Sequence, residues 1–336
     1  MGIDLFEDCI CVNAVNCRPT DASGANRAPT KREIACCRPR VLSAVFRFRP
    51  RVIVLHGTEA VVSLLAHRWQ GNLGGITRWR GWTIPDRDLN AWVCPTFHPA
   101  YVMRAEGEYG EAYIIFEQDL KRAFSLVNKP LPRFCDEEKQ VEIVEDVREV
   151  RKLLWALNRT EGFLAFDIET TGLRPYDPQQ EIVCISFCRS WKRAYVIPAL
   201  KDRKTVFLLR QLLENPRIGK IAANMKFEET WMIIKYGIRP SPWAFDVMLA
   251  AHVLDNRQGV TGLKFQAYVN FGLLGYDKEV APYLKSNETS TLNRVPQMME
   301  NPELRKKLMM YCGVDSLVTY RLAMKQMKEL GVYGRN

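Results

Sequence analysis

The sequence predicts an α/β protein of two domains, and three observations lead to this prediction. The chain has 336 residues, more than one ordinary domain needs to bury its own core. Apolar residues make up 47% and charged residues 26%, which is typical of a globular protein. Short strand patterns alternate with helix patterns in both halves, as in α/β folds. We place the first domain at residues 1–128, a linker with prolines and charges at 129–140, and the second domain at 141–332.

In the first domain we expect strands and a helix in the order strand, strand, helix, strand. The first strand covers Cys9–Val15 and ends near Asn16, and the second covers Arg51–Gly57. The helix covers Glu59–His67 and the last strand covers Ala91–Phe97. A strand that leads through a turn into a helix indicates an α/β sandwich.

In the second domain apolar residues recur every three or four positions from Val147 to Leu157, which predicts a helix. Three strands in a meander follow, and then a helix, a strand and a helix. We place these six elements at Phe163–Glu169, Glu181–Cys188, Arg193–Ala199, Lys204–Asn215, Lys220–Asn224 and Lys226–Gly237. A further helical stretch covers Leu304–Leu330. This order predicts a three-layer α/β domain.

Charge and hydropathy limit the classes of partner. Lysine and arginine number 48 against 38 acidic residues, and the net charge of +10 permits a nucleic-acid partner. No uncharged apolar run reaches the roughly 18 residues that span a membrane. The first residues are acidic where a secretory signal is basic, so we expect no membrane partner and a cytoplasmic location in a bacterium or a phage-infected cell. Ten cysteines without an export signal favour thiols or metal ligands over disulfides.

Two carboxylates on the predicted strand at Phe163–Glu169 give the first functional signal. Asp167 and Glu169 are two residues apart, so they share one face, and the apolar residues between Leu164 and Ile168 fill the other. Adjacent carboxylates repel unless a cation lies between them, and oxygen ligands suit Mg²⁺ or Mn²⁺. The pair alone favours the alternative of two solvated charges on an edge strand.

Two further segments strengthen this signal. Tyr311 and Asp315 lie four residues apart in the long helical stretch, so they share a helix face. A phenol beside a metal-ligating carboxylate can orient an attacking water and help to deprotonate it. Between the two pairs, Asn224 is placed to cap a helix and Glu228 to reach inward. Each segment alone is compatible with ordinary packing, but their occurrence in this order is specific.

These segments resemble the three motifs of the DEDDy 3′–5′ exonucleases, the proofreading-type enzymes joined to family A DNA polymerases. The matching segments are Asp167-Ile-Glu-Thr-Thr-Gly-Leu, Asn224-Met-Lys-Phe-Glu228 and Tyr311-Cys-Gly-Val-Asp315. The resemblance covers roughly residues 140–332 and implies a ribonuclease H-like three-layer α/β/α fold. Glu228 departs from the family pattern, which usually has Asp at this place. Phe245-Asp246-Val-Met-Leu resembles a segment that often follows in polymerase-linked members, so Asp246 is a candidate to support the metal ligands or, alternatively, a helix N-cap.

The resemblance implies two divalent metal ions, Mg²⁺ or Mn²⁺, and an attacking water positioned by Tyr311 and Glu169. The implied metal ligands are Asp167, Glu169, Glu228 and Asp315. The implied substrate-binding residues are Thr170, Leu173, Asn224 and Phe227. Leu173 and Phe227 would wedge or stack the terminal bases, and core packing is the alternative for Phe227. The implied partners are the 3′ end of single-stranded DNA and a family A DNA polymerase encoded downstream.

The first domain carries a second resemblance. Four segments occur in the order found in the iron–sulfur uracil-DNA glycosylases, family 4 in particular: Asn13-Ala-Val-Asn-Cys17-Arg-Pro, Glu33-Ile-Ala-Cys-Cys37-Arg-Pro, Pro50-Arg-Val-Ile-Val-Leu-His-Gly and Thr96-Phe-His98-Pro-Ala-Tyr. The resemblance covers about residues 8–125 and implies an incomplete α/β sandwich of the uracil-DNA glycosylase type. Asn13 would read the uracil edge, and His98 would stabilise the departing base. Cys17 and Cys37 match two iron–sulfur ligands, with Cys36 as an alternative to Cys37.

The opening Cys-x-x-Cys and Gly-Glu-x-Pro-Gly loop of that family are missing, so the resemblance implies a truncated domain. Cys9 and Cys11 have the wrong spacing and place to supply the missing ligands. Because a four-iron cluster requires four ligands, we expect no 4Fe-4S cluster in the chain as given. We also expect no useful rate of uracil excision.

Together these patterns predict a metal-dependent 3′–5′ exonuclease that acts on DNA in proofreading, repair or replication. It would release nucleoside monophosphates and be fused to an inactive uracil-DNA glycosylase-like module. One alternative is an exoribonuclease of the ribonuclease D type, which shares the three motifs. Another is a non-catalytic module that binds DNA or docks a polymerase. The Asp246 segment and the glycosylase-like neighbour favour DNA.

Overall fold

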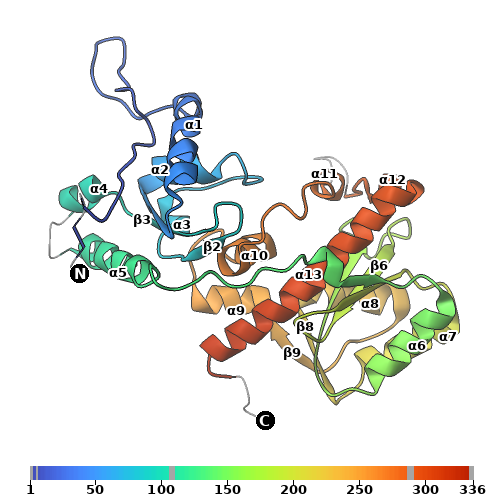
Figure 1. Ribbon diagram of the computed structural model, residues 1–336. Coiled ribbons are helices and arrows are strands. Elements are labelled where there is room, and N and C mark those ends of the chain that lie inside the picture. The colour runs from blue at the N-terminus through green and yellow to red at the C-terminus, as the bar shows by residue number, and fades with distance from the viewer. Residues whose placement is uncertain (1–2, 5–6, 106–109, 286–290, 333–336) are drawn as a thin grey trace. The chain divides into compact units, whose positions relative to one another are not determined.

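The computed structural model describes residues 3–4, 7–105, 110–285 and 291–332 (Figure 1). The chain divides into two compact units. The first unit contains residues 1–134, 257–259 and 267–275, and the second unit contains residues 135–256, 260–266 and 276–336. Each unit combines a β-sheet with helices, so the predicted α/β class with two domains is confirmed. No helix of the described residues is long and apolar enough to span a membrane.

The first unit is built on a three-stranded sheet in the order β1-β3-β2. These strands are β1 (Val52–His56), β3 (Ala91–Thr96) and β2 (Ile84–Asp86). β1 runs parallel to β3, and β2 runs antiparallel to it. The helices that accompany the sheet are α1 (Lys31–Phe48), α2 (Gly57–Leu65), α3 (Ile76–Trp79), α4 (Pro99–Arg104) and α5 (Glu111–Phe124).

Most of the predicted elements of the first unit are confirmed, namely the strands that became β1 and β3 and the helix that became α2. The predicted strand at Cys9–Val15 is wrong. The described residues before α1 form no strand, and most of them are exposed. A strand is stabilised by hydrogen bonds to a neighbour, and this segment has no neighbouring strand among the described residues.

The helix α1 follows that segment and escaped prediction. A capping box begins it: the Thr30 hydroxyl accepts a hydrogen bond from the Glu33 N–H at 3.3 Å, and the Thr30 N–H donates to Glu33 Oε2 at 2.7 Å. Pro39 lies inside the helix, and an internal proline normally argues against one. The segment with the adjacent Cys36 and Cys37 is therefore helical.

Two short segments from the second half of the sequence belong to the first unit, because their side chains form hydrogen bonds within it. The Tyr268 hydroxyl donates to Asp86 Oδ2 at 2.6 Å, and Arg68 pairs with the same oxygen at 2.7 Å. Arg257 donates to the carbonyl oxygen of Thr77 at 2.7 Å. The boundary between the units consequently falls inside α10 (Leu263–Phe271).

The second unit contains a six-stranded sheet in the order β4-β7-β6-β5-β8-β9. Its strands are β4 (Val141–Ile143), β5 (Gly162–Thr170), β6 (Ile182–Cys188), β7 (Ala194–Pro198), β8 (Ile218–Ala222) and β9 (Trp243–Asp246). β5, β6 and β7 are antiparallel neighbours, which confirms the predicted meander, and the other neighbours are parallel. β5 lies inside the sheet between β6 and β8.

Helices cover both faces of this sheet, so the predicted three-layer arrangement is confirmed. One face of β5 packs its apolar residues Leu164, Phe166 and Ile168 against three helices. These are α6 (Val147–Asn158), α7 (Arg203–Leu213) and α8 (Met225–Tyr236). The long helix α13 (Pro302–Glu329) crosses the other face (Figure 1). The remaining elements are η2 (Glu138–Gln140), α9 (Val247–Leu254), α11 (Ala281–Leu284) and α12 (Val295–Glu300).

A glycine lets α13 approach the sheet closely. A Cβ atom on Gly313 would lie 2.3 Å from Val141 Cγ1 and 2.7 Å from Val196 Cγ2. Both distances are far below van der Waals contact, so any larger residue would push the helix away from β4 and β7. Gly313 therefore sets the distance between the sheet and the residues that α13 carries beside it.

Candidate active site

The two carboxylates of β5 lie on the face that α13 covers. Ligand atoms of Asp167, Glu169 and Cys312 all lie within 4.8 Å of one another, and Cys312 Sγ is 3.6 Å from Asp167 Oδ2. Asp167 is half-buried and Glu169 is only 7% exposed. Because β5 is an interior strand, the alternative of two solvated charges on an edge strand is excluded.

Tyr311 and Asp315 lie on one buried face of α13, with exposed fractions of 8% and 5%. Asp315 Oδ1 forms an ion pair with the Lys264 ammonium and accepts a hydrogen bond from the Tyr276 hydroxyl at 2.6 Å. Lys264 Nζ also donates to the Tyr276 hydroxyl at 2.9 Å. The ammonium lies 4.1 Å from the ring centre of Tyr311 and 4.2 Å from that of Tyr276. This lysine therefore holds the carboxylate and both phenol rings in place.

Glu228 comes from the first turn of α8 and is 3% exposed. Its Oε2 atom is buried and has no hydrogen-bond partner among the described residues. A buried carboxylate oxygen without a partner is costly, because it has lost its hydration without a replacement. Such an atom fits a site that a cation completes.

Asp246 joins the beginnings of two helices. Its carboxylate caps α9 by accepting from the N–H groups of Met248 at 2.8 Å and Leu249 at 3.2 Å, so the N-cap interpretation is confirmed. The same carboxylate accepts from the N–H of Asn224 at 3.2 Å and of Met225 at 2.9 Å.

The predicted capping role of Asn224 is wrong. Asn224 stands at the N-cap position of α8, but its backbone is left-handed (φ 73°, ψ 58°) and its side chain makes no capping hydrogen bond. Asp246 satisfies the first N–H groups of α8 in its place. The amide of Asn224 is therefore not used by the helix.

Burial and mutual repulsion govern the electrostatics of the carboxylates. Burial raises the pKa of Asp167 well above its usual value, and the charge of Asp315 raises it further. Burial and then Asp167 raise the pKa of Glu169 and of Glu228 in the same direction. Three acids that resist ionisation together indicate a site that needs additional positive charge.

The phenol of Tyr311 is held in its neutral form. Burial raises its pKa well above the usual value, and the nearby carboxylate of Asp315 adds to the shift. A neutral phenol can orient a water by hydrogen bonding, but it cannot remove a proton from it.

The predicted substrate-binding residues have different surroundings. Leu173 is 60% exposed in the loop after β5. The Thr170 side chain is committed locally, because its hydroxyl donates to the Gly172 carbonyl oxygen at 2.7 Å. Phe227 packs against the core beside Trp231, with 6.0 Å between ring centres, as the core-packing alternative predicts. Of these three side chains, Leu173 is the one that presents an apolar surface to solvent.

Three residues of the site escaped prediction: Lys264, Tyr276 and Cys312. Lys264 belongs to a short helix and Tyr276 to the chain after it, so neither has a local pattern that marks it. Cys312 lies inside the third motif, and the helical period predicts its position beside the sheet rather than any function. Only the folded chain brings these three side chains to the carboxylates.

The candidate residues of the first unit do not converge in the same way. Asn13 and His98 are both exposed, and within the described residues no hydrogen bond joins them. His98 caps α4, with Nδ1 accepting from the Ala100 N–H at 3.1 Å. Cys17 is exposed and Cys37 is half-buried. Among the described residues, the cysteines before β1 do not form a group of three ligand atoms close enough to share a metal.

The match to known families accords with this geometry. The sequence profile of the 3′–5′ exonuclease family matches residues 141–331. This is more than half of the chain, so the chain belongs to the 3′–5′ exonuclease family. The profile of the uracil-DNA glycosylase superfamily matches residues 4–122. Both resemblances predicted from the motifs are confirmed.

Particular relatives match one half each. DNA polymerase I of Chloroflexus aurantiacus is 29% identical over 202 residues, which cover 58% of this chain and 20% of that protein. The type-4 uracil-DNA glycosylase of Thermotoga maritima is 34% identical over 123 residues, 37% of this chain and 58% of that protein. The structure of Escherichia coli RNase D, an exoribonuclease involved in structured RNA processing, is 17% identical over 58% of this chain and 46% of that chain, with a TM-score of 0.40. The chain thus spans a fifth of the polymerase and less than two thirds of the glycosylase.

Proposed function

We propose that residues 141–332 form a metal-dependent 3′–5′ exonuclease that degrades DNA and releases nucleoside monophosphates. The observation that carries the proposal is the group of Asp167, Glu169 and Glu228, whose pKa values are all raised by burial. The charge of Asp315 raises the pKa of Asp167 further, and the charge of Asp167 raises those of Glu169 and Glu228. Such a group is unfavourable by itself and becomes favourable beside divalent cations. These acids lie within residues 141–331, which match the 3′–5′ exonuclease family, and this match supports an exonuclease function for the group.

The residues present fit divalent metal ions. All four acids offer hard oxygen ligands, and the unpartnered Oε2 of Glu228 is free to ligate. We assign the ligand roles to Asp167, Glu169, Glu228 and Asp315. Bound Mg²⁺ or Mn²⁺ would supply positive charge to the scissile phosphate, the attacking water and the departing 3′ oxygen.

The side chains around the metal ligands have separate roles. The neutral phenol of Tyr311 orients the attacking water, and the carboxylate of Glu169 accepts its proton. Water oxygen then bonds to phosphorus as the bond from phosphorus to the 3′ oxygen breaks. Lys264 is a positioning residue, because it holds Asp315 and the ring of Tyr311 without reaching the reacting atoms. Asp246 supports the turn that carries Asn224, while the exposed side chain of Leu173 contacts a terminal base.

One comparison tests the substrate and the reaction together. Single-stranded DNA and RNA of the same sequence, labelled at the 5′ end, are incubated with the protein and Mg²⁺, and the products are separated. We expect stepwise shortening of the DNA from its 3′ end and release of monophosphates that EDTA abolishes. Faster degradation of the RNA would instead favour an exoribonuclease of the ribonuclease D type. No metal-dependent monophosphate from either substrate would favour a non-catalytic module.

We propose further that the first unit is a uracil-DNA glycosylase-like module without excision activity and without a 4Fe-4S cluster. This proposal is supported by the exposure of Asn13, His98 and Cys17 to solvent. We further propose that the two domains cover residues 1–128 and 141–332. The protein would act beside a family A polymerase, in repair or proofreading. Two measurements test this proposal. Iron and sulfide are quantified after anaerobic purification, and abasic sites are assayed on uracil-containing DNA.

A further inference from the structure

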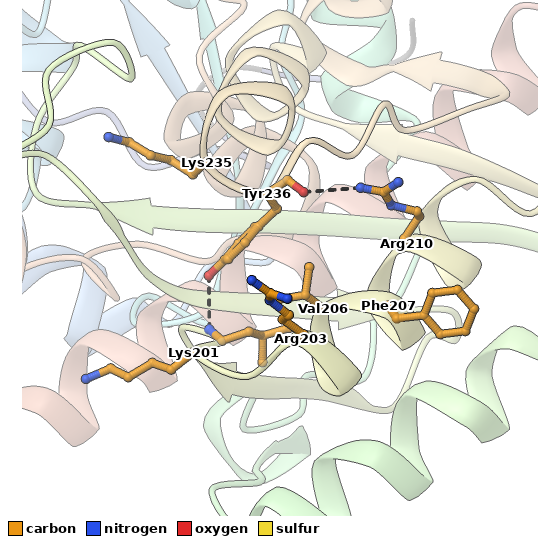
Figure 2. Close-up of a pocket in the computed structure, with 8 residues that line it drawn as sticks. Lys201, Arg203, Val206, Phe207, Arg210, Lys235 and Tyr236 are labelled. Atoms are coloured by element: carbon orange, nitrogen blue, oxygen red, sulfur yellow. Dashed lines mark hydrogen bonds between the residues drawn. The ribbon is translucent and has the colours of Figure 1, made fainter.

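A basic pocket of about 450 Å³ opens on the second unit, and none of the catalytic carboxylates lines it (Figure 2). It is lined by Leu200, Lys201, Arg203, Val206, Phe207, Arg210, Lys235 and Tyr236. Four of these eight described residues are basic and none is acidic. The ring of Phe207 is 56% exposed and lies at the other end of the pocket from Lys201 and Lys235 (Figure 2).

Hydrogen bonds to the backbone fix several of the residues that line the pocket. The Tyr236 hydroxyl accepts a hydrogen bond from the Leu200 N–H at 2.9 Å, which fixes the end of α8 against the chain before α7. Arg210 donates to the Gly237 carbonyl oxygen at 3.1 Å. Lys235 Nζ donates to the Asp177 carbonyl oxygen at 2.8 Å, which leaves the ammonium two further protons to donate.

The nearby carboxylate of Asp202 does not neutralise the pocket. It caps α7 by accepting from the Thr205 N–H at 2.9 Å, and it pairs with Arg151 at 2.9 Å. Both partners lie outside the pocket lining. Lys201 and Arg203 lie on either side of Asp202 in the sequence, are exposed and remain available to an anion.

The distance from the pocket to the catalytic carboxylates can be followed along two routes, across the sheet from β5 to β7 and along α8. Glu169 on β5 is in register with Cys184 on β6, and Cys184 is in register with Pro198 on β7. Two steps across a sheet amount to about 10 Å, and the pocket residue Leu200 comes two positions after Pro198. Along α8, Glu228 and Tyr236 are separated by about 12 Å of helix axis.

We infer that this pocket binds the sugar–phosphate backbone and one base of the substrate strand, a few nucleotides before its 3′ end. The inference rests on the proposed exonuclease function, which brings a polyanionic chain to this edge of the sheet. Four cations beside an exposed aromatic ring are the combination that holds single strands without sequence preference. The pocket would keep a shortened strand attached between successive hydrolysis steps.

Charge reversal tests the pocket, and the chain offers a matched control. Lys201→Glu with Arg203→Glu alters the pocket, whereas Lys192→Glu with Arg193→Glu makes the same charge change at the opposite end of β7, where both residues are exposed. Binding of a fluorescein-labelled DNA dodecanucleotide and trinucleotide is measured by anisotropy in EDTA. Release of the first nucleotide from the trinucleotide is measured with Mg²⁺.

We expect the pocket variant to bind the dodecanucleotide at least tenfold more weakly than the control variant. The slope of log affinity against log salt should become shallower by about 0.7 for each phosphate group that the variant no longer neutralises. Affinity for the trinucleotide and its rate of hydrolysis should not change. Phe207→Ala should weaken binding of the dodecanucleotide about fivefold, the lower end of the contribution from one stacked base.

Three outcomes would overturn the inference. Equal weakening by both charge reversals would show a general effect of net charge. Displacement of the dodecanucleotide by adenosine monophosphate from the control variant but not from the pocket variant would assign the pocket to a free nucleotide. The same difference with polyglutamate would assign it to an acidic protein segment. Failure of the wild type to hydrolyse any DNA would remove the exonuclease proposal but not a measured difference in binding, so the two failures are distinguishable.

Discussion

Glu228 and Asp315 of the second unit are 3% and 5% exposed, whereas Asn13 and His98 of the first unit are open to solvent. Both sets were predicted from motifs of comparable specificity. The second unit brings its acids together from β5, α8 and α13, where burial reduces the screening of each charge from the others. The first unit leaves Asn13 and His98 exposed, where water competes for their hydrogen bonds and constrains their positions weakly. The difference shows that the side chains of a motif influence one another strongly only when the fold buries them close together.

The largest effect should come from Asp167. Asp167→Ala removes the β5 carboxylate that lies 3.6 Å from Cys312 Sγ of α13. We expect exonuclease activity with Mg²⁺ to fall at least a hundredfold, or about 3 kcal/mol of transition-state stabilisation. The folded protein should persist, because the change relieves repulsion in the buried group. Monophosphate release and the thermal midpoint in EDTA measure the two effects. Near-wild-type activity of the variant would disprove the site.

Glu228 tests whether the longer acid has replaced the usual aspartate. We expect Glu228→Gln to lose at least about tenfold in activity, because changing even a group that only supports a metal ligand costs about that much. Glu228→Asp should keep part of the activity with an altered preference between Mg²⁺ and Mn²⁺. The ratio of rates with the two metals is the measurement. Equal rates for the wild type and Glu228→Gln would make this side chain a bystander.

The pH dependence of stability follows from the raised pKa values of Asp167, Glu169 and Glu228. Above the ordinary carboxyl pKa of about 4, the unfolded chain releases protons that the folded site retains, so these acids destabilise the metal-free fold as pH rises. In EDTA the thermal midpoint should therefore fall as the pH rises above about 4. The increase in thermal midpoint on adding Mn²⁺ should become larger over the same pH range.

A double variant provides the control for this pH effect. Asp167→Asn with Glu228→Gln removes two of the titrating groups while retaining their shape. Its thermal midpoint in EDTA should depend less on pH, and Mn²⁺ should stabilise it little. A stabilisation by Mn²⁺ that is the same at every pH, in the wild type, would contradict the assignment.

Lys264 should have a smaller effect, since it positions other groups. Lys264→Met frees Asp315 and loosens the ring of Tyr311, so the maximal rate should fall severalfold while Mn²⁺ binds more tightly. Mn²⁺ affinity, measured by calorimetry without substrate, separates this role from a loss of folding. Lys264→Arg should restore most of the rate. Unchanged Mn²⁺ affinity in Lys264→Met would show that the lysine does not compete for Asp315.

Local patterns were sufficient for much of the second unit. The alternation along β5 specified its buried apolar face, and the spacing of Tyr311 and Asp315 specified a shared helix face. These periodicities depend on the geometry of one strand or one helix. The approach of Glu228 to Asp167 was implied by the family resemblance, not by local spacing. The interior position of β5 in the sheet was not predicted.

Other features depend on contacts that no local pattern encodes. The apolar run at Cys9–Val15 has the composition of a strand but no neighbour among the described residues. The hydrogen bond from Tyr268 to Asp86 connects residues far apart in sequence, and so does the ion pair of Lys264 with Asp315. Such contacts form only after the chain has folded, so the sequence of either segment alone does not predict them.

The smallest effect should come from the first unit. His98→Ala removes the cap of α4, which costs about 0.5–1 kcal/mol of stability. Because His98 is exposed and belongs to the other unit, the exonuclease rate on single-stranded DNA should stay within about twofold of the wild type, and a change that small is under ~0.5 kcal/mol. The same preparation should form no abasic sites in uracil-containing DNA before or after the change. Abasic-site formation that depends on His98 would give the first unit a working site and remove the contrast between the two halves.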